Sequence, residues 1–102
     1  MKKLIVATSS VCLTAFLLSA QAYTGEKLAK EAKINLNEAR AIALKAFPGK
    51  IKDEELEKEK GGSGLRYSFD IKGDKSTNTQ EVGVDAVTGK VLENAPEGAH
   101  PD

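Results

Sequence analysis

The chain has 102 residues, in which 15 lysines and arginines balance 15 aspartates and glutamates, with one histidine, one cysteine and no tryptophan. This balance argues against nucleic acid, which requires a basic surface, and against an anionic membrane surface. One cysteine supports neither a disulfide framework nor a cysteine-based metal site. A chain of this size makes one small domain with a thin core and no deep pocket.

The first 22 residues have the anatomy of a secretory signal peptide. Two lysines precede an apolar run over residues 4–18, and residues 19–22 supply a small-x-small cleavage site. The apolar run has about 15 residues, fewer than the roughly 20 that a membrane-spanning helix needs. We therefore expect cleavage between Ala22 and Tyr23, a periplasmic or secreted location, and no stable membrane insertion afterwards.

Cleavage has two alternatives. The apolar run would otherwise remain as an N-terminal anchor, or Cys12 would carry a lipid. Cys12 follows a valine rather than a small residue, so we expect it to leave with the signal peptide. Cleavage would leave 80 residues with 13 basic and 15 acidic side chains, a net charge of −2.

The mature chain begins with a polar segment and then a helix. Residues 23–33 are only loosely periodic, which fits a frayed helical turn or a flexible leader, and we expect the leader. Asn35 and Glu38 predict a capping box at the start of a helix. Apolar residues then recur at helical spacing up to Phe47, and the Pro-Gly pair at 48–49 ends the helix.

The secondary structure of residues 50–60 is ambiguous between helix and strand. Their glutamates and lysines favour a helix by intrinsic propensity. Their only large apolar side chains, Ile51 and Leu56, cannot form a helical stripe. We expect a strand with Leu56 facing the core, and the opposite parity of Ile51 indicates a β-bulge. The glycine-rich residues 61–64 form the loop that returns the chain.

The clearest strand covers residues 65–72, where four apolar side chains alternate with four polar ones. A second alternating run covers residues 80–84, and a turn at residues 85–90 leads to a closing strand. Residues 95–102 are expected to be a disordered tail. The fold class is therefore α+β, with one amphipathic helix packed on a three- to four-stranded antiparallel sheet.

Three motifs carry a family resemblance: Leu-Asn-Glu-Ala-Arg-Ala-Ile-Ala-Leu at 36–44, Tyr-x-Phe-x-Ile at 67–71, and Val-Asp-Ala-x-Thr-Gly-Lys-Val at 84–91. With them, residues 34–94 resemble a PepSY domain, the module found in propeptides of thermolysin-like metallopeptidases and in many small secreted bacterial proteins. In propeptides the module is thought to hold a protease silent and to assist its folding. The resemblance implies a protein-binding module. No peptidase domain follows, so we expect any regulation of a peptidase to act in trans, on an unidentified envelope protein.

Catalysis is not expected, because a nucleophile needs an adjacent base and an orienting group, and the only histidine, His100, lies in the predicted tail. The acidic residues between 53 and 59 could attract Ca²⁺, which prefers several converging oxygens. Interleaved lysines neutralise them, and a strand points alternate carboxylates to opposite faces. We therefore expect no catalytic residue, no cofactor and no metal.

The candidate partner-contact face is the polar side of the clearest strand, formed by Arg66, Ser68, Asp70 and Lys72. A partner would bind this face or add a strand to the sheet edge. The simpler interpretation is that a sheet covered on one side must expose a polar face. Two further functions stay open. The first is a structural envelope domain that self-associates, for example as a homodimer. The second is a periplasmic protein that responds to a small ligand or metal.

Overall fold

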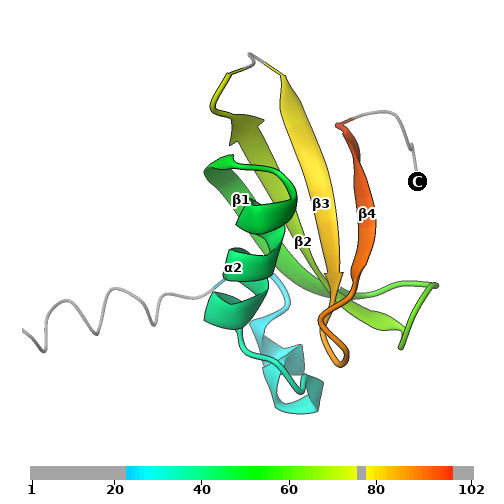
Figure 1. The fold of residues 1–102 in the computed structure, drawn as a ribbon. Helices are drawn as coiled ribbons and strands as arrows, with labels where there is room; N and C mark the ends of the chain where they lie inside the picture. The colour runs from blue at the N-terminus through cyan, green and yellow to red at the C-terminus, as the bar shows by residue number, and fades with distance from the viewer. Residues whose placement is uncertain (1–22, 76–77, 98–102) are drawn as a thin grey trace, which may run out of the picture.

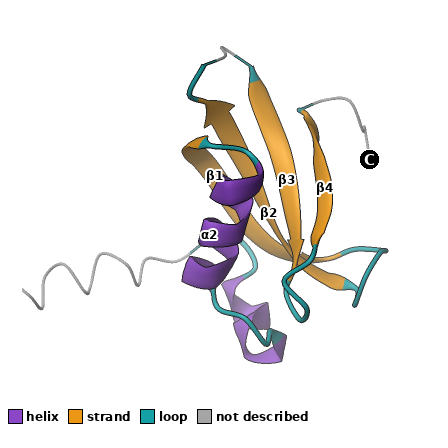
Figure 2. Cartoon of the chain, in the orientation of Figure 1, coloured by secondary structure: helices purple, strands orange, loops and turns teal. Residues whose placement is uncertain are grey.

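The computed structural model describes residues 23–75 and 78–97. The 3₁₀ helix η1 (Glu26–Glu31) and the α-helix α2 (Leu36–Ala46) come first. Four strands follow, β1 (Gly49–Lys58), β2 (Leu65–Gly73), β3 (Thr79–Asp85) and β4 (Val91–Pro96). The strands form one antiparallel sheet in the order β1-β2-β3-β4, and α2 lies against one of its faces (Figures 1 and 2). The predicted α+β architecture is confirmed.

The start of α2 follows from its capping residues. The Asn35 side chain accepts a hydrogen bond from the Glu38 backbone N–H at 2.8 Å, and the Glu38 side chain accepts one from the Asn35 N–H at 2.8 Å. These two bonds form the predicted capping box and satisfy two N–H groups that a helix start otherwise leaves unpaired. Ala39 and Ala43 are fully buried, so their small side chains let the helix lie close to the sheet.

The core lies between α2 and the face of the sheet that α2 covers, which we call the inner face. Its largest buried side chains come from three strands: Leu56, Tyr67, Phe69, Ile71, Val82 and Val84. The register between β1 and β2 shifts between Ile51 and Asp53, which places Ile51 opposite Ile71 and Leu56 opposite Tyr67. The predicted bulge is therefore confirmed, and it brings the two apolar residues of β1 to the same face.

The segment expected as a flexible leader over residues 23–33 packs against the domain instead. Residues 26–31 form η1, and the Leu56 N–H donates to the Thr24 carbonyl at 2.8 Å. Tyr23, Leu28 and Ala32 pack against the core, although they are too irregularly spaced to produce a helical pattern in the sequence. Partial burial of these three side chains, with the hydrogen bond to Thr24, explains why the segment is held.

The end of the domain also lies later than expected. Strand β4 continues to Pro96, and the Glu97 N–H donates to the Thr79 carbonyl at 3.0 Å. Residues 98–102, with His100, and the predicted signal peptide, with Cys12, lie outside the described residues. Within the described residues, no helix has both the length and the apolar character required to cross a bilayer.

Candidate functional site

The side of the sheet opposite α2, which we call the outer face, carries all four residues of the predicted contact surface. The alternation of β2 places Arg66, Ser68, Asp70 and Lys72 here, because Tyr67, Phe69 and Ile71 fill the inner face. Of these four residues, only Lys72 is exposed, and Asp70 is half-buried. Arg66 and Ser68 are each 7% exposed, so the outer face is less open to solvent than the alternation suggests.

Arg66 is buried because it lies flat across a glycine. A Cβ atom at Gly83 would stand 3.2 Å from Nη1 and 3.3 Å from Cδ of Arg66. Nη1 donates to Glu93 at 3.3 Å, and Nη2 donates to the Lys60 carbonyl at 2.9 Å. Nε is buried and has no hydrogen-bond partner among the described residues. The outer face therefore holds a buried cation with one unsatisfied donor.

Ser68 is covered from the neighbouring strand. Its hydroxyl donates to the Glu57 carboxylate of β1 at 2.7 Å. Glu55, which is opposite Ser68 in the register, stands on the same face. The surroundings of Ser68 are therefore acidic.

A row of carboxylates crosses the outer face. The register places Asp53 of β1 opposite Asp70 of β2, and Asp70 opposite Glu81 of β3. We call Asp53, Asp70 and Glu81 the acidic row. Burial, with the charges of Glu97 and Asp53, raises the pKa of Asp70 above its usual value.

The pKa of Glu55 is raised in the same way. Burial is the largest cause, followed by the charges of Glu57, Asp53 and Asp70. Negative charge is therefore concentrated on the outer face around Glu55 and Asp70. This concentration was not predicted, because it depends on which strands are neighbours and in which register.

Asp85 also lies on β3 but has a structural role. The Ser63 N–H and hydroxyl donate to its carboxylate at 2.7 and 2.8 Å, and the N–H groups of Val87 and Thr88 donate at 2.8 and 3.0 Å. Burial alone would raise the pKa of Asp85, but these hydrogen bonds outweigh it and lower the pKa to about 2. Asp85 thus joins the glycine-rich loop to the β3–β4 turn, which lies where the sequence predicts a turn, at residues 85–90.

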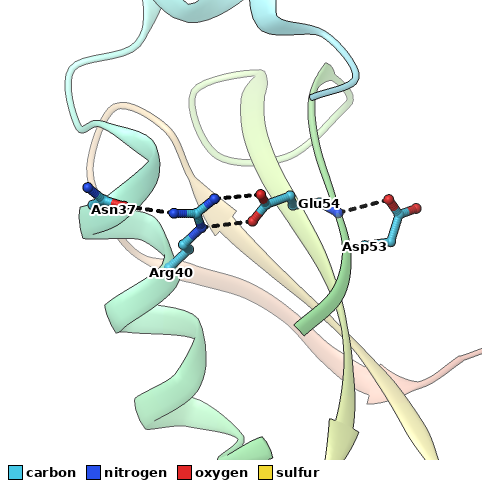
Figure 3. Close-up of polar contacts among 4 residues, drawn as sticks. All are labelled: Asn37, Arg40, Asp53 and Glu54. Carbon is cyan, nitrogen blue, oxygen red and sulfur yellow. Dashed lines mark hydrogen bonds and ion pairs between the residues drawn. The ribbon is translucent and has the colours of Figure 1, made fainter. Parts of the chain in front are cut away.

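The second polar cluster joins the helix to the edge strand, and Figure 3 shows its geometry. Arg40 of α2 donates to both carboxylate oxygens of Glu54, from Nε at 2.9 Å and from Nη2 at 2.6 Å, and Nη1 donates to Asn37 at 2.8 Å. The sequence pattern did not single out this pair. Beside it, Tyr23, Thr24 and residues 51–54 line an open polar groove of about 360 Å³.

The described residues hold no candidate metal site, and the hydroxyl groups of Ser63 and Tyr67 have hydrogen-bond partners within the fold. None of their groups of three or more aspartate, glutamate, histidine or cysteine side chains could hold a metal ion. The Ser63 hydroxyl donates to the Asp85 carboxylate at 2.8 Å, and the sole histidine of the sequence, His100, lies outside the described residues. Burial raises the pKa of Tyr67 to about 12, and its hydroxyl donates to the Ile34 carbonyl at 2.9 Å, so it is a poor acid or base near neutral pH.

These features define a small α+β module with one helix-covered sheet face and one polar face. The family model for PepSY, described as "Peptidase propeptide and YPEB domain", matches residues 33–94, and the chain belongs to this family. The match confirms the resemblance carried by the three sequence motifs. PepSY domains are generally non-catalytic modules. No curated protein and no solved structure matches the chain.

Proposed function

We propose that the protein is a non-catalytic, extracytoplasmic binding module that inhibits or otherwise regulates a peptidase in trans. The family description, which names peptidase propeptides, supports this assignment of a partner class. The observation that carries it is the outer face, where charged side chains from all four strands gather and no described helix lies over them. A face of this kind suits recognition of another protein.

Self-association and metal response have less support. Val91, at 39% exposure, is the one exposed large apolar side chain among the described residues, so they form no broad apolar patch for a dimer. The acidic residues of β1 are spread over two faces, since Glu54 is bound to Arg40 on the inner side. We therefore rank the binding module first.

The proposal is tested by adding the processed, purified protein to an envelope extract and to a purified thermolysin-like metallopeptidase, with fluorescent casein as substrate. We expect a saturable, dose-dependent change in the rate of casein hydrolysis in at least one of the two. The matched control is the Phe69→Asp variant, which we expect to be unfolded because it places a carboxylate in the core. No change in either reaction at any concentration of the folded protein would overturn the proposal.

A further inference from the structure

The first three described residues, Tyr23, Thr24 and Gly25, follow the edge of β1 that faces away from β2, and we call them the N-terminal strap. The Leu56 N–H of β1 donates to the Thr24 carbonyl at 2.8 Å. Gly25 has a φ of +85°, and a Cβ atom there would overlap the Leu56 carbonyl oxygen. Chain ends are usually poorly ordered unless contacts of this kind hold them. The strap is therefore part of the folded domain.

The side chain of Tyr23 also holds the strap in place. It is half-buried, packs against the core and is hydrogen-bonded to Tyr67. Burial is the main cause that raises the pKa of the Tyr23 hydroxyl, and the charge of Glu26 is the next. The charge of Glu54 raises this pKa further, and Arg40 opposes it by less. The surroundings of Tyr23 thus favour a positive charge.

Asp53 holds its carboxylate at the same edge of β1. Backbone N–H groups along a strand point alternately to its two edges, so the N–H of Glu54 points to the same side as that of Leu56, which is the side of the strap. The Asp53 carboxylate accepts a hydrogen bond from this Glu54 N–H at 3.0 Å (Figure 3). The Asp53 carboxylate and the strap therefore share one edge of the sheet.

The register brings the backbone of Tyr23 beside this carboxylate. Thr24 forms a parallel bridge with Glu55, so Tyr23, one residue earlier, is level with Glu54. Tyr23 and Asp53 both line the open polar groove described above. In this groove the Glu54 carboxylate is already bound through both oxygens to the guanidinium of α2. Asp53 is thus the acidic side chain best placed to bind a further cation.

The sequence predicts cleavage between Ala22 and Tyr23, which would create an α-amino group at this position. Such a group is mostly protonated at neutral pH. We propose that the α-ammonium group of Tyr23 in the processed protein binds the Asp53 carboxylate, so that removal of the signal peptide stabilises the folded domain. In the precursor the same nitrogen belongs to an uncharged peptide bond, and the ion pair does not form. The inference does not depend on the identity of any partner.

The test compares synthetic forms of the mature chain, residues 23–102, with a free or an acetylated Tyr23 amine, each with and without Asp53→Asn. Acetylation removes the charge and keeps every side chain of the strap. It should lower the melting temperature of the unsubstituted chain by about 1–5 °C, the scale of one surface ion pair in a small domain. It should not change that of Asp53→Asn. Any change in the repulsion between residue 53 and Asp70 cancels in this cycle.

The matched control is Asp74→Asn, an exposed carboxylate beyond the end of β2. Asp74 follows Gly73, which pairs with Gly49 at the start of β1, away from the strap. Acetylation should therefore lower the melting temperature of this variant as much as that of the unsubstituted chain. The control separates the loss of one particular ion pair from a general effect of net charge.

The pH dependence supplies a second readout. The ion pair favours the protonated amine and raises its pKa in the folded state, so the stabilisation is present at pH 7 and is lost as the pH rises through that pKa. The difference in melting temperature between the free and acetylated forms should vanish by about pH 10. The other charged groups around the groove are common to both forms, so their titration cancels: Lys52, Glu54, Glu26 and Arg40.

Mass spectrometry of the protein purified from cells that express the full-length gene should show Tyr23 as its first residue. Three outcomes would overturn the proposal: a different first residue, an acetylated chain as stable as the free one, or an equal loss on acetylation in Asp53→Asn. The last would mean that the amine stabilises the fold through another group. The casein assay tests the regulatory function alone, so the two proposals can fail separately.

Discussion

The two faces of the sheet are formed by alternate residues of the same strands, but they differ in what holds them together. On the inner face, apolar side chains such as Phe69 and Val82 meet the alanines of α2, and burial is complete. On the outer face, Arg66 and Ser68 are hydrogen-bonded to the carboxylates of Glu93 and Glu57. The inner face is thus optimised for stability, whereas the outer face keeps opposed charges that stability alone would not favour.

Phe69→Ala tests the inner side of this comparison and should have the largest effect. Phe69 is fully buried, and truncating a buried phenylalanine costs about 3–5 kcal/mol in the free energy of unfolding. Small domains have only about 5–15 kcal/mol in total. The measurement is urea unfolding followed by circular dichroism, with Val91→Ala, at an exposed position, as the control that should change little.

Asp85→Asn tests whether one outer-face residue contributes to the fold as strongly as a core residue. The amide NH₂ of asparagine would face N–H donors of Ser63, Val87 or Thr88, so the variant should lose about 1–3 kcal/mol of unfolding free energy. An unchanged stability at pH 7 would show that the two loops are held together without this carboxylate.

The contribution of Asp85 to the stability of the fold should decrease as the pH is lowered. Its pKa is about 2 in the folded protein and 3.8 for an unperturbed aspartate, so the folded state favours the ionised form. The stabilisation is therefore complete above about pH 4 and is lost as the pH falls towards 2. The stability difference between the wild-type protein and Asp85→Asn should shrink over this interval in thermal melts.

Arg40→Lys tests the contact between the helix layer and the sheet edge, and a smaller effect is expected. Lysine cannot donate two parallel hydrogen bonds to Glu54 as Arg40 does. Because both side chains are partly exposed, at 31% and 21%, the cost should be about 0.5–1 kcal/mol in urea unfolding. A loss as large as that of Phe69→Ala would contradict the view that the inner core dominates stability.

The sequence predicts the inner face better than the outer one, for a physical reason. The capping box at Asn35 and the alternation of β2 are local patterns, and even the bulge near Ile51 follows from the parity of two apolar residues. The burial of Arg66 depends on Gly83 and Glu93, which reach it only through the register of other strands.

Two other features also depend on tertiary packing. The Arg40–Glu54 pair needs the position of α2 on the sheet, which no spacing in the sequence gives. The segment at residues 23–33 is held by contacts of Tyr23 and Leu28 with the domain, although its own pattern is weak. Local patterns therefore predicted the elements, but not the polar contacts between them.

The most direct test of the difference between the faces is the unfolding free energy of Asp70→Asn at pH 7, one residue away from Phe69 on the same strand. We predict a value equal to that of the wild-type protein or higher by about 0.2–1 kcal/mol, because the burial of a charged carboxylate and its repulsion with Glu97 and Asp53 are relieved. The raised pKa of Asp70 means that the ionised form is disfavoured in the folded state, so any gain should diminish as the pH is lowered. A decrease of about 1 kcal/mol or more in the free energy of unfolding, which is typical of a destabilising substitution, would contradict the predicted difference between the faces. Asp70 would then stabilise the fold.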